Sequence, residues 1–551
     1  MVRGVKASAS GARQPATPAL MSMEANVRRS SETVKDGPAG AAAERRAARV
    51  LDSLRRPRRI LPPWALRVLG TAASSKGPLR RPRGAALAVF AAALSGCAAV
   101  GPNYHLPTEA LINAPAAAGP FVGAGLKAEA QAPLPDRWWR LYQSPDLDRL
   151  VTEAFAANTD LRVAQANLER SHALVKEAEA ARQPNLMLGG SVARAQLSAE
   201  QYLEFSQLPM TTLYEVGLTA SYQLDLFGGI RRGVEAAKAD DEAIEAARDL
   251  VRVTVAGDVA KAYVDVCGAG DQLAAARASL ALQQQSLALT QRLAQGGRAT
   301  RLDLTRSQGQ IDQFRANIPA LEAARRNALY RLATLTGKPP AAFEADLARC
   351  VSAPPLAQPI PIGDGAALLK RRPDVRAAER RLAARTAEIG VATAALYPDI
   401  TLGAAIGSTG VTHDLFKAAT NDYSIGPGIS WSLNQSAARA RIKAAKASQV
   451  AELARFDGVV LTALRDVEVA LNVYGHDLER QNNLTAARDQ AASALADARR
   501  LQAAGRTGSL ATLDAERTLA AAQSALAATR AQIADDQVAV FLALGGGWET
   551  G

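Results

Sequence analysis

The chain has 551 residues, of which 48% are hydrophobic and 5% aromatic, and its formal net charge is +12. The positive excess is confined to residues 1–83, which hold 18 Lys and Arg against 5 Asp and Glu; the remainder holds 47 basic and 48 acidic residues. A body that is electrically balanced and poor in aromatic residues lacks the basic surface that nucleic acids require, so we expect no nucleic-acid partner.

The first 96 residues are predicted to be absent from the mature protein. Residues 1–76 are rich in Arg, Ala, Pro and Ser without periodicity, and are interpreted as disordered or as a wrongly assigned start. Residues 77–96 combine basic residues with a short apolar run, the pattern of a signal peptide. The run ends in Leu94-Ser95-Gly96-Cys97, which resembles the bacterial lipobox, so a covalent lipid is predicted on Cys97.

A first structural unit is predicted over residues 145–337, after a lead-in over 97–144. Apolar residues at three- and four-residue steps predict a helix from Pro145 to Arg182, closed by Pro184. Two strands follow, at about 186–196 and 216–226, and the second alternates cleanly between apolar and polar residues.

A very long helix is predicted next, over about 231–295. At 1.5 Å per residue it would be on the order of 100 Å long, which is typical of a coiled coil or a helical tube. Gly296-Gly297-Arg298 turns the chain, and a shorter helix follows over about 301–336. No stretch outside the signal region reaches the 18 apolar residues of a membrane-spanning helix, which leaves a β-barrel as the membrane option.

The second unit, residues 364–545, repeats this order after a linker over 338–363, and a tail covers 546–551. It is predicted to contain a helix over 364–396, strands over about 399–408 and 422–433, a helix over about 436–504, and a last helix to Leu544.

Matching residues indicate that the two units are copies of one ancestral unit. Asn158–Arg162 aligns with Arg372–Arg376 at an offset of 214, and Gly297 aligns with Gly505 at 208. Such a long period indicates a duplicated domain rather than a solenoid. The four strands of one chain would leave open edges in a membrane, so several chains must contribute to one barrel, and three would supply twelve strands.

Reactive side chains form no catalytic or metal-binding pattern. The four His residues lack metal-ligand spacing, and Cys267 and Cys350 are interpreted as thiols, with a bridge between them left open. The pairs Asp240-Asp241 and Asp535-Asp536 are expected to face solvent. We therefore expect no enzyme activity, no metal, and no cofactor beyond the lipid on Cys97.

Several short motifs, weak alone but specific in their order, resemble the TolC-like outer-membrane factors, and within them the NodT/OprM-type lipoproteins. They span residues 94–548: Leu94-Ser95-Gly96-Cys97, Gly101-Pro102-Asn103-Tyr104, Trp138-Trp139, Leu224-Asp225-Leu226-Phe227-Gly228, Arg371-Arg372-Pro373-Asp374, Leu396-Tyr397-Pro398 and Leu544-Gly545-Gly546-Gly547-Trp548.

The resemblance implies a mainly α fold with transmembrane β structure: a homotrimer whose 12-strand outer-membrane β-barrel continues into a 12-helix periplasmic α-barrel. The loops near 197–212 and 409–421 would be extracellular. The turns at 296–300 and 505–508 would form the periplasmic tip, and residues 338–363 with the chain ends would form a belt around the tube.

The function implied is that of the exit duct of a tripartite efflux system in the outer membrane of a Gram-negative bacterium. Its partners would be a periplasmic membrane-fusion adaptor, an inner-membrane RND-type pump and outer-membrane lipid, and its cargo small toxic compounds. Two alternatives remain: a type I secretion duct with the same architecture, and a lipid-anchored periplasmic coiled-coil adaptor without a pore.

The resemblance also assigns site residues at the tip. A periplasmic gate would consist of Leu510, Asp514 and Arg517, which share one face of the last helix. The first repeat does not keep this set, since Arg306 and Gly309 stand where Asp514 and Arg517 do. The adaptor would contact the tip turns at Gly296, Gly297, Arg298, Gly505, Arg506 and Gly508.

Overall fold

The computed structural model describes residues 99–123, 129–130, 132–200 and 205–546, all of which belong to one compact unit, Ala88–Gly551. The predictions for residues 1–76, for the signal peptide 77–96 and for Cys97 lie outside the described residues. So does nearly all of the tail, from residue 547 onward.

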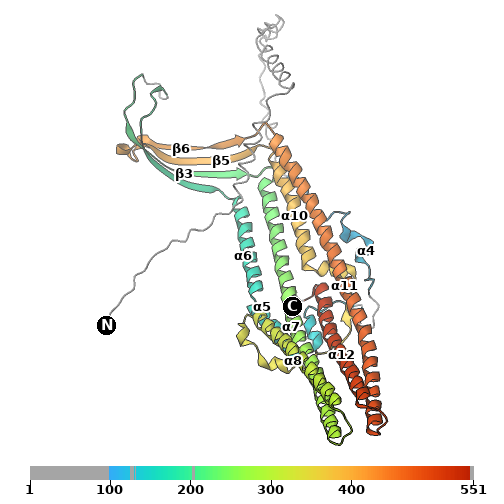
Figure 1. The fold of residues 1–551 in the computed structure, drawn as a ribbon. Coiled ribbons are helices and arrows are strands. Elements are labelled where there is room, and N and C mark those ends of the chain that lie inside the picture. Colours follow the sequence, from blue (N-terminus) through green and yellow to red (C-terminus); the bar gives the residue numbers. More distant parts are fainter. Residues whose placement is uncertain (1–98, 124–128, 131, 201–204, 547–551) are drawn as a thin grey trace, which may run out of the picture. The chain divides into compact units, whose positions relative to one another are not determined.

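The described chain is mainly helical with one four-stranded sheet (Figure 1). The first half contains α5 (Pro145–Ala157), α6 (Thr159–Ala180), β2 (Asn185–Ala195), β3 (Thr211–Leu224), α7 (Gly229–Gln295) and α8 (Arg301–Leu335). The second half contains α9 (Gly365–Arg371), α10 (Pro373–Ala394), β5 (Asp399–Val411), β6 (Asn421–Ser430), α11 (Ser436–Ala503) and α12 (Ser509–Ala543). The order of elements is the same in both halves.

Smaller elements accompany these. The lead-in forms α4 (Pro115–Ala118), β1 (Glu129–Ala130) and a 3₁₀ turn over Trp138–Tyr142. The segment between the halves forms β4 (Ile360–Pro361), which pairs in parallel with β1. The lead-in and the middle segment are therefore held together by backbone hydrogen bonds.

The helices predicted over 145–182 and 364–396 were wrong in one respect, because each is broken in two. At Asn158 the backbone is extended, and its side-chain oxygen accepts the N–H groups of Asp160 and Leu161, at 2.9 and 3.2 Å, which starts a new helix. At Arg372 the backbone is again extended, because the following Pro373 disfavours helical geometry in the residue before it.

The four longest helices end in the same way. Each has a glycine with positive φ just past its end, at Gly297, Gly337, Gly505 and Gly545. The next residue then donates its N–H to a carbonyl five residues earlier, as Arg298 does to Leu293 at 2.7 Å. This is the Schellman geometry, which only glycine adopts without strain.

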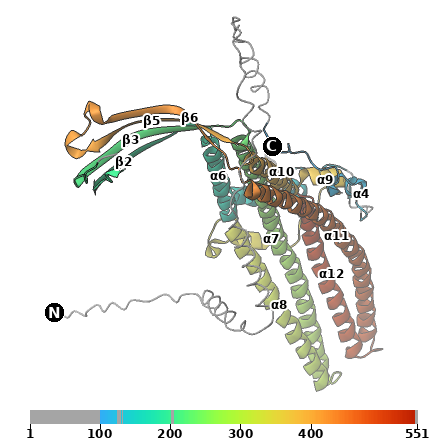
Figure 2. The same cartoon turned by 90° about the horizontal axis from the view of Figure 1, so that it is seen from above.

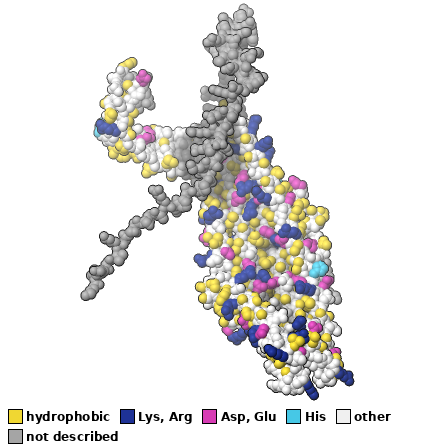
Figure 3. Space-filling model, viewed as in Figure 1, with side chains coloured by type: hydrophobic (Ala, Val, Ile, Leu, Met, Phe, Trp, Pro, Cys, Tyr) yellow, Lys and Arg dark blue, Asp and Glu magenta, His cyan; other side chains and the backbone are white. Residues whose placement is uncertain are grey.

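The sheet is antiparallel throughout, with strand order β2-β3-β5-β6. Its register confirms the predicted alternation: Leu188, Leu218, Ile406 and Tyr423 stand opposite one another across the four strands and share one face. The other face carries small and polar residues such as Gly217, and Figure 3 shows few charged side chains on the sheet. The sheet therefore has one apolar face and one polar face, the apolar one defined by the row of Leu218.

Chain connectivity places the sheet at one end of the helices. Only four or five residues separate each strand from the helix before or after it, at 181–184, 225–228, 395–398 and 431–435. The hairpin loops 196–210 and 412–420 consequently lie at the far end of the sheet. The helical turns at 296–300 and 504–508 lie at the far end of the helices, as Figure 1 shows.

Helix α7 is central to the helical part, because it packs against α6, α8, α10 and α12. Helix α11 packs against α10 and α12 but has no extensive contact with α7, so the helices form a single layer rather than a bundle (Figure 2). No helix in the described part of the chain combines the length and the apolarity needed to cross a bilayer.

The largest hydrophobic core lies where the lead-in crosses α5, α7 and α12. Trp138 stacks on Phe541 with ring centroids 4.5 Å apart, and Tyr142 meets the same ring edge-on at 6.3 Å. All three rings are fully buried. These rings attach the lead-in to the C-terminal part of α12, at mid-height of the long helices.

Cys267 of α7 and Cys350 of the middle segment form a disulfide, so their interpretation as separate thiols was wrong and the bridge that was left open exists. Gly270, one turn along α7, lies so close to this segment that any side chain there would collide with the carbonyl oxygen of Cys350. The middle segment is thus both covalently bonded and tightly packed on α7.

The expectation that Asp535 and Asp536 face solvent was also wrong. Asp536 is only 5% exposed; its Oδ1 accepts a hydrogen bond from Gln532 at 2.9 Å, and Oδ2 has no donor among the described residues. Burial, together with the nearby carboxylates of Asp477 and Asp535, raises the pKa of Asp536 to about 6. Burial likewise raises the pKa of Asp535, although Lys261 lies 2.8 Å away.

Replacing both cysteines, Cys267→Ser with Cys350→Ser, is expected to lower the apparent melting temperature of the protein. The bridge closes a loop with a sequence separation of 83 residues. Bridges that close loops of this size typically contribute about 2–4 kcal/mol. Thermal unfolding with and without a reducing agent measures this difference. We expect the unbridged variant to be as stable as the reduced parent and less stable than the oxidised parent. Equal stability of all forms would contradict the prediction.

Asp536→Asn is expected to raise stability at pH 7.5 and to leave it unchanged near pH 4. The pKa of this carboxyl is higher in the folded state than in the unfolded chain, so the native state loses stability as pH rises from about 4 through about 6. One pKa unit corresponds to about 1.4 kcal/mol. Melting curves from pH 4 to 8 check this, with the more exposed Asp535→Asn as the comparison; an unchanged pH profile in Asp536→Asn would count against it.

Candidate functional site

The two helical turns lie side by side at the end of the helical part. The predicted turn residues Gly296, Gly297, Arg298, Gly505, Arg506 and Gly508 are all exposed. A groove of about 650 Å³ separates the turns, with Arg298 on one side and Arg499 and Thr507 on the other. The structure therefore brings the turn residues of both halves onto one accessible surface.

Asp303 connects the two turns. One of its carboxylate oxygens accepts the N–H and the hydroxyl of Thr300, at 2.9 and 2.7 Å, which caps α8. The other accepts the hydroxyl of Ser509, the first residue of α12, at 2.8 Å. Hydrogen bonds from Thr300 and from Ser509 hold the pKa of Asp303 below its usual range.

Glu516 forms a second link, deeper in the layer. Its side chain is almost fully buried, and Oε1 accepts hydrogen bonds from the hydroxyl of Ser286 on α7 at 2.8 Å and from Arg499 on α11 at 2.9 Å. A buried carboxylate needs such donors, since removing one leaves an uncompensated charge. Glu516 therefore joins α12 to both α7 and α11.

The three predicted gate residues all lie near the start of α12. Leu510 is 59% exposed, and Asp514 and Arg517 are exposed as well. The carboxylate of Asp514 has no hydrogen-bond or ion-pair partner within the described chain. Arg517 donates from Nη2 to Oε1 of Gln310 on α8, at 3.1 Å. Asp514 and Arg517 thus share a helix face without pairing with each other, and Arg517 forms a third link to the first hairpin.

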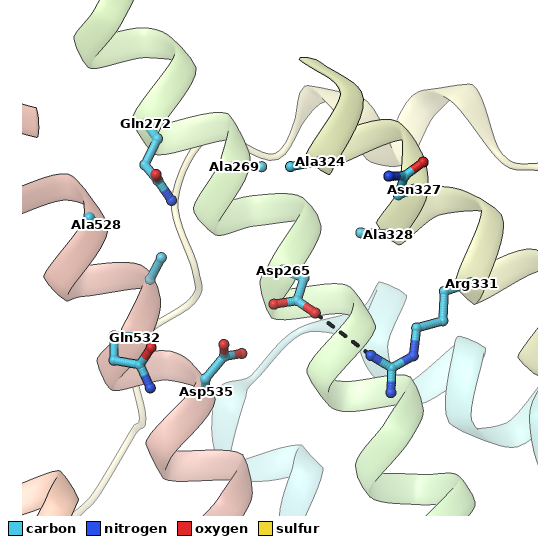
Figure 4. A pocket seen from close by; sticks show the side chains of 11 residues that line it. Asp265, Ala269, Gln272, Ala324, Asn327, Ala328, Arg331, Ala528, Gln532 and Asp535 are labelled. Carbon is cyan, nitrogen blue, oxygen red and sulfur yellow. Dashed lines mark ion pairs between the residues drawn. The ribbon is translucent and has the colours of Figure 1, made fainter. Parts of the chain in front are cut away.

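Arg517 borders a chain of hollows that runs along α7 between α8 and α12. A hollow of about 510 Å³ is lined by Arg517 and Gln272, and Gln272 also lines the next one, of about 430 Å³ (Figure 4). Cys267 and Gly270, which contact the middle segment, lie about half a helical turn away from this lining on α7. Arg517 and the hollows are therefore on the opposite face of the helical layer from that segment.

The second hollow is polar but close to charge-balanced. Figure 4 shows Asp265 facing Arg331, with a nearest separation of 4.0 Å. Asp535 borders the same hollow and is paired with Lys261. Such paired charges make a hydrated wall without a strong preference for one sign of charge. No three His, Cys, Asp or Glu side chains converge on a metal-sized site in the part of the chain that the structure describes.

Sequence reasoning missed three residues of this site: Asp303, Gln310 and Glu516. The spacing of Thr300 and Asp303 is that of a helix-capping box, which the sequence could have revealed. Gln310 and Glu516 carry no such signal, because their roles depend on which helix lies next to them.

Comparison with known proteins gives a family match in both halves. Residues 150–338 and 366–546 match the model of the family described as outer membrane efflux protein. The pyoverdine export outer membrane protein OpmQ of Pseudomonas putida is 33% identical over 432 residues, covering 77% of this chain and 90% of its own. Nodulation protein T of Rhizobium leguminosarum is 30% identical and covers 83% of this chain and 96% of its own.

A solved structure and one further relative complete the comparison. The structure of the outer-membrane channel OprN superposes with a TM-score of 0.75 at 33% identity, covering 82% of this chain and 99% of that one. The probable outer membrane lipoprotein SilC of Salmonella typhimurium is 28% identical and covers 83% of this chain and 96% of its own.

These matches confirm the resemblance to TolC-like factors of the NodT type, the mainly helical fold with four antiparallel strands, and the location in the outer membrane of Gram-negative bacteria. They also exclude the adaptor without a pore, because the family consists of channels and not of enzymes or adaptors. The chain belongs to the outer membrane efflux protein family and is an outer-membrane efflux channel.

Proposed function

We propose that three copies of this chain close into one continuous duct, the exit of a tripartite efflux system driven by an inner-membrane RND-type pump. The observation that carries the proposal is the open sheet. Strands β2 and β6 are its two outer strands, and each has a neighbour on one side only among the strands that the structure describes. Unpaired backbone groups are costly in lipid, so the outer strand of one copy must pair with that of the next, and three copies make a closed sheet of twelve strands.

The two faces of the sheet support the same arrangement. In a closed sheet within a bilayer, apolar residues face the lipid and small or polar residues face the water-filled interior. The apolar face defined by the row of Leu218 would be outside, and the face with Gly217 inside. The long hairpin loops 196–210 and 412–420 would then lie at the extracellular end.

The helices would continue the duct into the periplasm as a tube of twelve helical columns. Each half supplies one long helix, α7 or α11, and a column of two shorter ones stacked end to end. We propose that residues 145–337 and 364–545 are the two repeats of this tube. The linker 338–363 and the lead-in 97–144 would form a belt on the outside, and the hollows along α7 would face the lumen.

The exposed tip turns suit a periplasmic membrane-fusion adaptor as their partner. Their glycines keep the turns short, and Arg298 and Arg506 offer charged side chains at the rim. The cargo would be small toxic compounds, which the charge-balanced wall of the duct conducts passively. The relative OpmQ is named for pyoverdine export, which favours efflux over the type I secretion of proteins.

The lipid anchor on Cys97 is part of the proposal. It rests on the motif Leu94-Ser95-Gly96-Cys97 and on the relative named as a probable outer membrane lipoprotein. An acylated Cys97 would hold the lead-in at the inner leaflet of the outer membrane, next to the junction of sheet and helices. There Val100 already donates its N–H to the carbonyl of Phe227.

We also propose that the start of α12 is the gate. Leu510 of three copies would narrow the lumen, and Asp514, which has no partner among the described residues of its own chain, would pair with another copy. The links from Ser509, Glu516 and Arg517 to the first hairpin would keep the gate closed. Opening requires α12 to move away from α7 and α8, and therefore to break these hydrogen bonds.

Native mass spectrometry of detergent-extracted protein is expected to show particles of three chains, each beginning at an S-acylated Cys97. The open strand edges require several copies, the family resemblance implies three, and the lipobox implies the acylated start. Cys97→Ser should lose the lipid mass while the particle remains trimeric. A monomer or dimer would contradict the duct, and a longer unmodified chain would contradict the anchor.

Gln310→Ala is expected to increase the conductance of the closed channel in planar lipid bilayers several-fold. The change removes the acceptor for Arg517, and hydrogen bonds to charged groups contribute about 1.5–3 kcal/mol. Gln308→Ala is the matched control, because Gln308 is exposed on the same helix and bonds only Asp312 of α8.

Asp514→Ala in the same assay tests the proposed contact of Asp514 between copies separately from the links of α12 to the first hairpin. It should also increase closed-state conductance if Asp514 pairs between copies, because that contact is lost in all three chains at once. Conductance equal to that of the parent in both Gln310→Ala and Asp514→Ala would remove α12 as the gate. An effect of Gln308→Ala as large as that of Gln310→Ala would show that the assay reports general loosening of α8.

A further inference from the structure

The loop between β5 and β6, residues 412–420, is folded back onto the apolar face of the sheet. Cross-strand register pairs Tyr214 with Gly410, at the loop end of β3 and β5. Both residues belong to the face defined by the row of Leu218, because they are an even number of residues from Leu218 and Ile406 along their strands. Whatever covers Tyr214 and Gly410 therefore lies on that apolar side.

Thr420 and Phe416 of the loop cover these two positions. The hydroxyl of Tyr214 bonds Ser408 at 2.7 Å and Thr420 at 2.9 Å, and it accepts the backbone N–H of Phe416 at 3.0 Å. Tyr214 is only 3% exposed as a result. The loop is thus attached to the apolar face by a compact, fully bonded hydroxyl cluster rather than extending freely from the strands.

Gly410 is the position that makes this close approach possible. A Cβ atom there would lie 2.6 Å from a carbon of Thr420, which is closer than two carbons can approach without displacement. The missing side chain leaves space for the loop on the apolar face. The fold of the loop is therefore encoded in the strand itself.

The attached loop presents an apolar tip to its surroundings. Leu415 is 51% exposed and Phe416 is 62% exposed. The backbone of Phe416 has a positive φ of 59°, which a bulky residue seldom adopts. This residue lies at the tip of the loop, where both side chains project. His413, Asp414 and Lys417 flank the tip, and Lys417 is paired with Asp414 at 2.5 Å.

We propose that Leu415 and Phe416 insert into the outer leaflet of the outer membrane and anchor the extracellular rim of the channel to lipid. The surface is continuous with the apolar face that meets the bilayer, so the inference rests on the proposed orientation of the sheet. An aromatic and an aliphatic residue flanked by paired charges match the boundary between acyl chains and headgroups. The occupant is the lipid of that leaflet, with acyl chains against Leu415 and Phe416.

Site-directed spin labelling tests the anchor in the full-length channel, reconstituted into vesicles of phosphatidylethanolamine and phosphatidylglycerol. Phe416→Cys carries the label at the tip, and Ile406→Cys carries it on the apolar face nearer the middle of β5. Glu215→Cys is the matched control, because Glu215 is exposed at nearly the same height on the other face. The native Cys267 and Cys350 are bridged and do not take the label.

Accessibility to oxygen, which concentrates in lipid, is compared with accessibility to a water-soluble nickel chelate. The oxygen-to-nickel ratio is expected to be several-fold higher at position 416 than at 215, and highest at 406. A high ratio at 406 with a ratio at 416 equal to that at 215 would overturn the anchor alone. Low access of both reagents at 416 would show that protein covers the tip and would also overturn it. A low ratio at 406 would overturn the proposed orientation of the sheet.

The variant Thr420→Val controls for displacement of the loop by the spin label itself. This change removes the hydroxyl that bonds Tyr214 but keeps the shape of the side chain. Combined with the label at 416, it should release the loop from the apolar face and lower the oxygen-to-nickel ratio several-fold. A ratio unchanged by Thr420→Val would contradict the role of the hydroxyl cluster in holding the tip in lipid.

Discussion

A sheet placed in a bilayer cannot leave backbone N–H and C=O groups unpaired, because hydrocarbon offers them no partner. In this chain the constraint falls on β2 and β6, the two outer strands of a four-stranded sheet. Each chain therefore carries an unfinished sheet that becomes stable in lipid only when its edges meet those of other copies. The two helical pairs of each chain follow from the same constraint, because every strand hairpin is joined to its own helices by only a few residues.

The short junctions between strands and helices couple the position of the sheet to the position of the helices. A strand and a helix that are separated by four or five residues cannot be rearranged independently, so closure of the sheet, as proposed, would also fix the positions of the helices below it. Helix α7 then acts as the common support, packed on α5, α6, α8, α10 and α12 and bridged to the middle segment by Cys267. The start of α12, the proposed gate, contacts the first hairpin partly through polar side chains, such as Ser509 with Asp303 and Arg517 with Gln310.

Much of the fold could be predicted from the sequence, because its elements are long and strongly periodic. The alternation around Leu218 and the helical pattern around Val255 each fit one period only, and the glycines at 297 and 505 mark turns that other residues adopt with strain. The break at Asn158 was not predicted, because the apolar pattern continues across it. The capping role of Asn158 depends on a single extended residue, which periodicity over a long window does not register.

Features that depend on neighbouring helices could not be predicted from the sequence. Asp536 looks like any surface carboxylate in a helix, and its burial follows from the packing of α12 on α11. The same holds for the bridge of Cys267 with Cys350, which are 83 residues apart and meet only because the middle segment crosses α7. At the candidate gate, the shared face of Asp514 and Arg517 was predictable from spacing. The partner of Arg517 was not, because Gln310 comes from the other repeat.

The duplication is least symmetric where the two hairpins begin their return helices, and this asymmetry has a physical consequence. Helix α8 starts with a complete capping box, in which Thr300 and Asp303 satisfy each other's backbone groups. Helix α12 has Gly508 at its N-cap position, which offers no side chain for a cap, and its first residue, Ser509, bonds Asp303 of the other hairpin. Glycine at an N-cap costs only about a few tenths of a kcal/mol relative to Ser, Thr, Asn or Asp, so the difference in local stability is small. The second hairpin thus depends on the first for part of its local stability, whereas the first is complete without the second. The bond from Ser509 to Asp303 is an attachment between the hairpins that has to break if α12 opens as proposed, and this asymmetry favours the second hairpin as the moving part of the proposed gate.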